Sequence, residues 1–259
     1  FATDGSVRFA PFVSKGRIYF GSDDGHIYCI NALNGSQIWK YRPGPSGEHI
    51  IGRERMVSLW PIRTGVLVED GVLYAAAGIF PYEGLYIVAL DIQTGRPIWV
   101  NDTAGDQAWG LQYGGAAPQG YIVASSDTVF IPAGRSMPVA FDKRTGKFKR
   151  FLSGGGKIGG SWTMMDGNEL FAGNNNQGTD TKIAFNASSG SKQADQFSNF
   201  PSIDMVLTKD TAFIVTQKGI YCIDRAANRK ANSAVPSLAK ESATLAKSIT
   251  EIRKKHKAA

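Results

Sequence analysis

The sequence is poor in the residues that build metal centres and disulfide frameworks. It has two cysteines and three histidines in 259 residues. His26, His49 and His256 show none of the spacings that metal-binding histidines share. The sequence also has no serine elbow and no Cys–His pairing of the kind that nucleophilic enzymes use. We therefore expect neither a metal site nor a hydrolase.

Long apolar runs are missing as well. No stretch reaches the length of about 18 apolar residues that a transmembrane helix needs. The start, FATDGSVRFAPFV, lacks the charged beginning and apolar middle of a signal peptide and has the pattern of a strand. We therefore expect the natural N-terminus to lie further upstream. A hydrophobic share of 42% with 30 glycines is typical of a globular β protein with many turns.

What the sequence does contain is a repeat. VALDIQTGRPIW places Gly95 four residues after Asp91 and Trp99 eight residues after it, and CINALNGSQIW repeats these offsets. The five copies begin with Asn31-x3-Gly35-x3-Trp39, Asp91-x3-Gly95-x3-Trp99 and Asp142-x3-Gly146, and continue with Asn186-x3-Gly190 and Asp224-x3-Asn228. Two apolar runs separated by a tight turn precede each copy. The pattern predicts five units of four short antiparallel strands, each a propeller blade.

The motif has a structural explanation. The Asp or Asn side chain can accept hydrogen bonds from the backbone of its own turn, and glycine provides the positive φ that the turn needs. The tryptophan starts the outer strand and can pack against the next blade. Later copies replace it with Arg150, Ala194 and Asn232. We therefore expect only Trp39 and Trp99 to join blades in this way.

GRIYFGSDDGHIYCINALNGSQIW and VLYAAAGIFPYEGLYIVALDIQTGRPIW resemble the repeats of the pyrroloquinoline quinone (PQQ)-type propellers, whose pattern is YVGS-DDG-YVYALDAKTG-W. That superfamily includes the quinoprotein alcohol dehydrogenases and the propeller lipoprotein of the bacterial outer-membrane assembly machinery. The resemblance covers about residues 1–232. It implies an all-β propeller in an exported bacterial protein, periplasmic or secreted. Because such propellers usually have seven or eight blades, we expect an open arc completed by further blades of a longer chain, with a closed five-bladed ring as the alternative.

The resemblance also raises the question of a cofactor. The dehydrogenases carry a vicinal disulfide and a calcium site of Glu, Asn and Asp around the quinone. Here Cys29 and Cys222 occupy the same strand position in the first and fifth copies, so we expect both to be buried and unpaired. Asp204 and the run 174–176, three asparagines, could supply oxygen ligands. We expect no PQQ or calcium and a non-catalytic domain, with a dehydrogenase fragment as the alternative.

The tail, residues 233–259, differs in composition from the repeats. Leu238, Leu245, Ile249 and Ile252 follow one another at spacings that place them on one stripe of an amphipathic helix. The tail holds six lysines and arginines against two glutamates, more than half of the chain's net charge of +7. Nucleic-acid binding is one interpretation. We expect instead a solvated helix, an insertion or linker between blades, and no nucleic-acid partner.

A glycine-rich segment matches the dinucleotide-binding pattern. Gly154-x-Gly156-x-x-Gly159 has the required spacing, but it leads into the strand-like run SWTMM where the pattern requires a helix. We therefore expect a loop between blades here.

Loop lengths favour one face of the propeller for binding. The connections at 42–60, 77–86, 102–118, 133–138 and 173–181 are long and fall on the same face, which we call the loop-rich face; the turns on the opposite face are short. The residues of this face that are typical of binding surfaces are Arg53, Arg55, Trp60, Trp109, Tyr113 and Arg135. We expect them to contact a protein or a glycan.

A second set of residues falls at the entry to the innermost strands. Counting back from the second strand of three blades gives Arg8, Arg63 and Gln119. Two arginines at a channel mouth could attract an acidic group. The alternative is that these arginines are solvated or paired with carboxylates.

Overall fold

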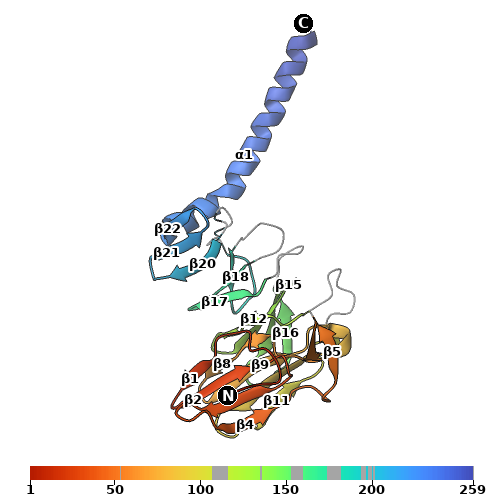
Figure 1. Ribbon diagram of the computed structural model, residues 1–259. Coiled ribbons are helices and arrows are strands. Elements are labelled where there is room, and N and C mark those ends of the chain that lie inside the picture. The colour runs from red at the N-terminus through yellow and green to blue at the C-terminus, as the bar shows by residue number, and fades with distance from the viewer. Residues whose placement is uncertain are drawn as a thin grey trace.

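The structure is a computed structural model that describes residues 1–52, 54–106, 116–134, 136–152, 160–173, 182–193, 197, 200 and 202–258; of 136 and 253–258 it describes the backbone alone. Within these residues, five antiparallel sheets of three or four strands follow one another along the chain, and one long helix comes last (Figure 1). This confirms the predicted all-β propeller architecture with a C-terminal helix. No helix in the described ranges is long and apolar enough to cross a membrane.

The first three blades each have four strands in sequential order. Blade 1 consists of β1 (Phe12–Ser14), β2 (Arg17–Gly21), β3 (Ile27–Asn31) and β4 (Gln37–Tyr41). Blade 2 consists of β8 (Leu67–Glu69), β9 (Val72–Ala77), β10 (Tyr86–Asp91) and β11 (Pro97–Asn101). Blade 3 consists of β13 (Val123–Ala124), β14 (Thr128–Ala133), β15 (Ser136–Asp142) and β16 (Phe148–Phe151).

Blades 4 and 5 have three strands each within the described part of the chain. Blade 4 consists of β17 (Trp162–Asp166), β18 (Glu169–Gly173) and β19 (Lys182–Asn186), and a bridge from Phe185 to Lys192 marks its outer edge. Blade 5 consists of β20 (Ser202–Leu207), β21 (Thr211–Thr216) and β22 (Gly219–Asp224). The predicted fourth strand of blade 5 is replaced by a helix.

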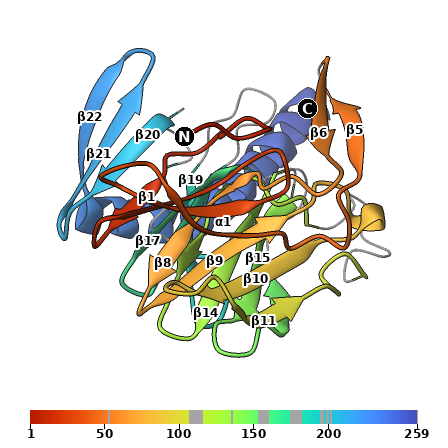
Figure 2. The same ribbon diagram turned by 60° about the horizontal axis from the view of Figure 1, so that its bottom comes forward.

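Smaller elements lie in the connections between blades. The strands β5 (His49–Gly52) and β6 (Arg55–Ser58) form a separate hairpin that stands out at the edge of the molecule (Figure 2). A single 3-10 turn, η1 (Pro81–Glu83), follows β9. Short parallel strands β7 (Thr64–Gly65) and β12 (Gly120–Tyr121) pair with each other. This pairing joins the segments that enter blades 2 and 3.

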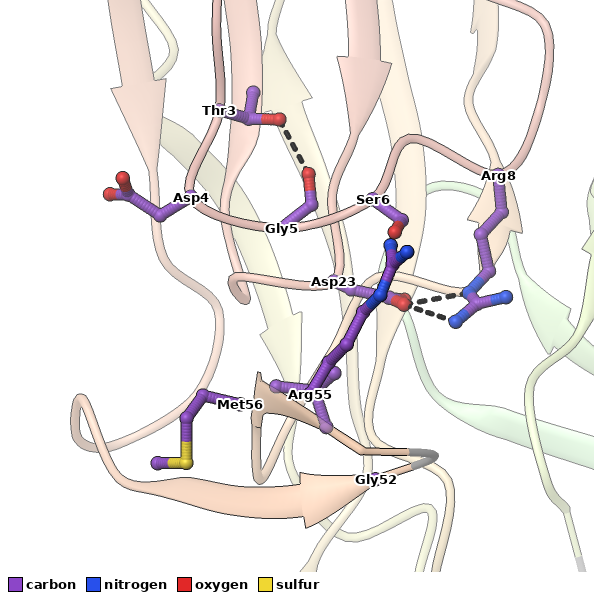
Figure 3. Close-up of a pocket in the computed structure, with 10 residues that line it drawn as sticks. Thr3, Asp4, Gly5, Ser6, Arg8, Asp23, Gly52, Arg55 and Met56 are labelled. Carbon is purple, nitrogen blue, oxygen red and sulfur yellow. Dashed lines mark hydrogen bonds and ion pairs between the residues drawn. The ribbon is translucent and has the colours of Figure 1, made fainter.

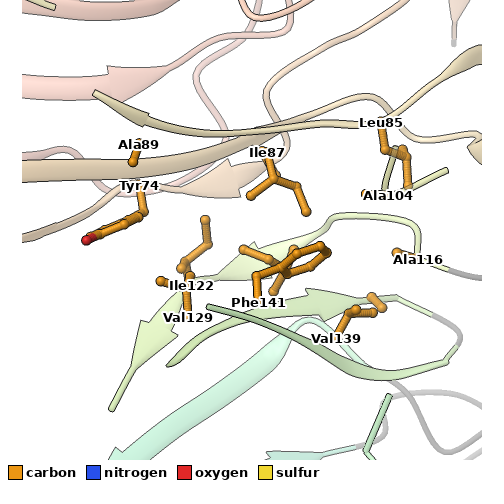
Figure 4. Close-up of a cluster of buried hydrophobic side chains, with 13 residues drawn as sticks. Tyr74, Leu85, Ile87, Ala89, Ala104, Ala116, Ile122, Val129, Val139 and Phe141 are labelled. Carbon is orange, nitrogen blue, oxygen red and sulfur yellow. The ribbon is translucent and has the colours of Figure 1, made fainter. Parts of the chain in front are cut away.

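Alternate residues of each strand bury against the two neighbouring blades. Between blades 2 and 3, Tyr74 and Ile87 of blade 2 pack with Val129 and Phe141 of blade 3 (Figure 4). Each of these side chains is at most 4% exposed. Small residues at the facing positions, such as Ala89, let the sheets approach closely. The hydrophobic interior is therefore a series of layers between successive sheets.

The repeat motif forms the turn after the third strand of the blade. In blade 2, Asp91 Oδ1 accepts hydrogen bonds from the backbone N–H groups of Gln93 (3.1 Å) and Thr94 (2.8 Å). Gly95 adopts φ +69°, a conformation that glycine reaches without a Cβ clash. Asn31 with Gly35, and Asp142 with Gly146, form turns of the same kind.

In blades 1 to 3, a side chain of the fourth strand docks on the motif turn of the next blade. Trp39 lies on Gly95 and donates its indole N–H to Ile92 O at 3.2 Å, and Trp99 docks on Gly146 in the same way. The expectation that only these two positions join blades was wrong. Arg150 of blade 3 lies on Gly190 and donates a hydrogen bond to Ala187 O at 2.8 Å. A guanidinium therefore replaces the indole at this interface.

The helix α1 (Arg225–Ala258) begins earlier than the expected boundary at 233. Asp224, the motif residue of the fifth copy, accepts a hydrogen bond from Ala227 N at 2.7 Å and so acts as a helix N-cap. Arg225 is 2% exposed and binds Asp166 (2.5 Å) and Glu169 (2.9 Å) of blade 4. These ion pairs fix the start of the helix, which then projects away from the sheets (Figure 1).

The two cysteines lie in different surroundings. Cys29 is buried between blades 1 and 2, whereas Cys222 is exposed, contrary to expectation. Both occupy the same strand position, but the face of blade 5 that carries Cys222 also exposes Phe213 and Ile220. In blade 1 the equivalent face is covered by blade 2. The arc of blades is open at the blade 5 face.

Candidate functional site

A cavity opens on the loop-rich face beside blade 1. It has a volume of about 730 Å³ and is lined by residues 3–6, Arg8, Asp23, Gly52 and residues 55–57 (Figure 3). Its walls therefore come from three parts of the chain: the N-terminal segment, the turn between β2 and β3, and the β5–β6 hairpin. This brings together Arg8 and Arg55, which the sequence placed in two separate candidate groups.

Backbone hydrogen bonds hold the three walls in place around Asp23. Its N–H donates to Ser6 O (2.9 Å) in the N-terminal segment, and its carbonyl accepts from Ser58 N (2.8 Å) at the base of the hairpin. Gly5 lies so close to the turn that a Cβ there would be 2.3 Å from Asp24 N. The cavity therefore has a fixed floor, because its segments are tied to a single turn.

The Asp23 carboxylate is the centre of an ion-pair cluster. Its side chain is 1% exposed, and it binds Arg8 Nε at 2.7 Å and Arg63 Nε at 3.3 Å. The hydrogen bond to Asp23 raises the pKa of the Arg8 guanidinium. Arg8 and Arg63 thus come together as paired arginines, the alternative that the sequence left open. Gln119 belongs to blade 3, where its backbone forms a bridge with Ala133.

Arg55 differs from these arginines because it is exposed and, within the described residues, has no ion-pair partner. Its side chain extends from the hairpin toward Ser6 and Asp23 (Figure 3). Ile51 and Met56 face each other across the same hairpin and are 79% and 59% exposed. The hairpin therefore combines a free cation with an open apolar surface, a combination typical of protein-binding sites.

The other predicted binding residues fall into two groups. Trp60 is 6% exposed, donates its indole N–H to Glu83 O at 2.7 Å and packs against Gly44, so it holds two long connections together and is not an accessible anchor. The remaining predicted residues, Arg53, Trp109, Tyr113 and Arg135, lie outside the described residues.

Sequence reasoning missed the acidic pair at the centre of the site. Asp24 adjoins Asp23 and accepts hydrogen bonds from His26 N (2.9 Å) and the Tyr28 hydroxyl (2.8 Å). Burial alone would raise the pKa of Asp24, but hydrogen bonds from His26 and Tyr28 lower it below its usual value. The signal was present as two adjacent carboxylates in a turn flanked by apolar strands. A buried carboxylate needs partners, and this could have directed attention to Arg8 and Arg63.

The oxygen ligands considered for a calcium ion were Asp204 and residues 174–176. No three His, Cys, Asp or Glu side chains in the described part of the chain converge on a point that could hold a metal ion. Asp204, considered as an oxygen ligand, has its Oδ1 engaged by the Trp162 indole N–H (3.2 Å) and its own neighbour Met205 N (2.8 Å). Residues 174–176 lie outside the described residues.

Sequential four-stranded sheets with motif turns and docked outer strands define a β-propeller repeat protein of the PQQ-like class. A family model described as outer membrane protein assembly factor BamB matches residues 2–233. The chain belongs to this family. Among solved structures, BamB from Moraxella catarrhalis is similar, with a TM-score of 0.56 and 17% identity over 82% of this chain and 55% of that one.

Quinohemoprotein alcohol dehydrogenase ADH-IIG from Pseudomonas putida is similar in structure and in sequence. Its structure gives a TM-score of 0.60 at 19% identity, covering 87% of this chain and 41% of that one. The curated sequence is 28% identical over 152 residues, 56% of this chain and 19% of the relative. Tetrathionate hydrolase from Acidithiobacillus ferrooxidans is 27% identical over 184 residues, 67% of this chain and 33% of the relative. The chain thus spans a third or less of these curated relatives.

Proposed function

We propose that this chain is a non-catalytic PQQ-like propeller domain that binds a partner through its loop-rich face, in the periplasm or outside a bacterial cell. The observation that carries the proposal is the β5–β6 hairpin. It exposes Ile51 and Met56 beside a cavity lined by Arg55, which has no ion-pair partner among the described residues, and backbone hydrogen bonds to Asp23 hold its base. Rigid scaffolds with exposed apolar and arginine side chains are suited to protein recognition.

Of the two partner classes expected from the sequence, a protein fits the described site better than a glycan. None of the described residues that line the cavity is aromatic, so they offer no flat apolar surface on which a sugar ring could stack. The hairpin instead offers two strands with exposed apolar side chains. The family description, an assembly factor for outer membrane proteins, agrees with a protein partner.

The alternative is a fragment of a quinoprotein dehydrogenase. The sequence identity of 28% with a quinohemoprotein alcohol dehydrogenase favours it, although the match covers 19% of that enzyme. Tryptophans and glycines of the motif explain such similarity without a shared activity, because they serve the blade interfaces.

A reconstitution experiment separates the two functions. The chain is incubated with PQQ and Ca²⁺, and bound quinone is measured by absorbance after gel filtration, together with dye-linked oxidation of primary alcohols. We expect no retained quinone and no turnover above the protein-free background. Stoichiometric quinone with alcohol oxidation would overturn the non-catalytic proposal and favour the dehydrogenase.

A further inference from the structure

The helix α1 leaves the sheets soon after it begins. Every side chain from residue 235 to residue 252 is exposed, and this part of the helix projects away from the blades (Figure 1). In proteins most helical stability comes from the packing of an apolar face and not from intrinsic propensity. The segment also contains Pro236 and several serines, threonines and β-branched residues, which favour a helix less than alanine does. A partner surface would therefore stabilise the projecting segment.

The apolar side chains of this segment form a narrow line along the helix, which we call the seam. Its members follow one another at alternating steps of three and four residues: Val235, Leu238, Ser242, Leu245, Ile249 and Ile252. The five apolar members are each between 49% and 66% exposed.

The width of the seam indicates what covers it. Two positions in every seven is the pattern of a coiled coil, whereas a helix that lies on a globular core has three or four apolar positions in two turns. A helix that lies on a membrane surface typically adds Trp or Phe to its apolar face, and the seam has neither. Ala239 and Ala246 flank the seam, and their small side chains let a second helix approach closely. The pattern therefore favours another helix as the occupant.

The seam is complementary to itself when a second copy runs in the opposite direction. With the midpoint of the two helices at residues 243–244, nearly every apolar member faces an apolar member of the second copy. The facing pairs are Val235 with Ile252, Leu238 with Ile249, and Ser242 with Leu245. One chain therefore supplies both halves of the contact, as a two-fold symmetric dimer requires.

Charge favours this antiparallel direction over a parallel one. The end of the helix carries a basic cluster, which consists of Arg253, Lys254, Lys255 and Lys257. In a parallel pair the clusters of both copies would lie side by side, and like charges repel each other. In the antiparallel pair each cluster lies beside residues 230–234 of the other copy, where Lys230 is the one charged residue. The repulsion is therefore smaller.

We propose that α1 is a self-association element, whose seam from Val235 to Ile252 pairs with the seam of a second copy in an antiparallel two-helix coiled coil. The blades of the two copies lie at opposite ends of the helix pair, so the dimer carries two loop-rich faces. The inference goes beyond the proposed function and is independent of it, because it uses no residue of the loop-rich face.

Sedimentation equilibrium of the full chain tests the association. With five apolar side chains from each copy, we expect a reversible dimer with a dissociation constant on the order of 10 µM. Leu238→Gln combined with Ile249→Gln should weaken the dimer about tenfold or more, because both substitutions place an amide inside the seam. Tryptophan fluorescence checks that the blades remain folded, since all five tryptophans lie between residues 39 and 162.

A matched control places the same two side chains on the opposite side of the helix. Lys240→Gln combined with Lys247→Gln should leave the dissociation constant within about threefold, since both lysines are exposed and lie away from the seam. A monomer at the highest soluble concentration, or equal weakening by the two double variants, would overturn the inference. So would a monomeric chain that binds phosphatidylglycerol vesicles and loses this binding on Leu238→Gln with Ile249→Gln, which would indicate a membrane-surface helix.

A distance between spin labels tests the direction of pairing. The label is attached to Lys257→Cys in a chain that also carries Cys222→Ser, because Cys222 is exposed. At a rise of 1.5 Å per residue, the two labels of an antiparallel pair lie about 40 Å apart. In a parallel pair they would lie roughly 10–20 Å apart, close to the spacing of the helix axes. A short distance would overturn the proposed arrangement.

Discussion

Trp39 of blade 1 lies directly on Gly95 of blade 2, so closely that a Cβ on the glycine would be 2.6 Å from the Trp39 Cδ2 atom. The glycine therefore has two roles, since its φ of +69° makes the turn and its bare Cα receives the indole. The same relationship joins Trp99 to Gly146 and Arg150 to Gly190. The repeat motif is thus half of an interface that the preceding blade completes.

A matched pair of glycine substitutions tests this relationship. Gly35 and Gly95 have nearly the same φ, +70° and +69°, but nothing lies within 4 Å of a Cβ at Gly35. Gly35→Ala should cost about 1–2 kcal/mol of unfolding free energy from backbone strain. Gly95→Ala should cost a further 1–3 kcal/mol or so because its methyl group displaces Trp39. Equal losses in urea titrations would show that the indole contact contributes nothing.

Arg150 should be a stabilising residue. Its guanidinium donates to carbonyls of Ala187 and Ser188 in the next blade. Arg150→Ala leaves these acceptors without that donor and should lower the unfolding free energy by about 1–3 kcal/mol. Arg144, exposed in the preceding turn, provides the control. Arg144→Ala should change stability by less than about 0.5 kcal/mol, and the prediction fails if the two variants melt together.

The Asp23 cluster should contribute strongly to stability. Asp23→Asn removes the charge that Arg8 and Arg63 share in a site where the carboxylate is 1% exposed. The arginines are themselves partly exposed and can regain water, so we expect a loss of about 2–4 kcal/mol, somewhat below that for a fully buried pair. Asp102→Asn, at an exposed position, is the control for charge removal. Chemical denaturation measures both, and comparable stability of the two variants would contradict the assigned role.

The motif turns should make a small contribution that depends on pH. A hydrogen bond from the Thr145 hydroxyl, with help from the backbone, lowers the pKa of Asp142 below its ordinary value of 3.8. Because the folded pKa lies below the unfolded one, this contribution is present above pH 3.8 and is lost as the pH falls through the folded pKa. Thr145→Val should raise the pKa of Asp142 in a carbon-detected NMR titration. An unchanged pKa would show that the hydroxyl is not the cause.

The blades could be predicted from the sequence because their signals are local. A turn such as Asp91 to Gly95 is formed by hydrogen bonds within four residues, and the alternation of apolar side chains along a strand is equally short in range. Five copies of such a signal then identify the propeller by their period.

The start of the helix could not be predicted in the same way. Asp142 accepts a hydrogen bond from the backbone N–H three residues later, in Thr145, and Asp224 does the same with Ala227. The first arrangement is a turn and the second is a helix N-cap, yet the aspartate makes the same contact in both. What distinguishes the helix in the structure is the pairing of Arg225 with Asp166 and Glu169 of blade 4, residues far away in the sequence.

The candidate site could be predicted only in part, because the roles of its residues also depend on contacts between positions far apart in the sequence. Arg8, Arg55 and Arg63 could be selected by residue type and by position in the repeat. Their different roles depend on Asp23, which is 15 residues from Arg8 and 40 residues from Arg63. Only the folded arrangement shows that two of the arginines are ion-paired with Asp23 and that Arg55 has no ion-pair partner among the described residues. Trp60 was misassigned because an indole in a long connection can pack inward as well as outward.

Site-specific photo-crosslinking tests the central claim most directly, that the loop-rich face binds a protein. A benzophenone amino acid replaces Met56 in the hairpin or, in a matched protein, Asn34 in an exposed short turn on the opposite face. Both proteins are irradiated in the cells that naturally produce this chain, and adducts are identified by mass spectrometry. The account predicts one discrete protein adduct from position 56 and none from position 34. Adducts from position 34 alone, or from neither position, would contradict it.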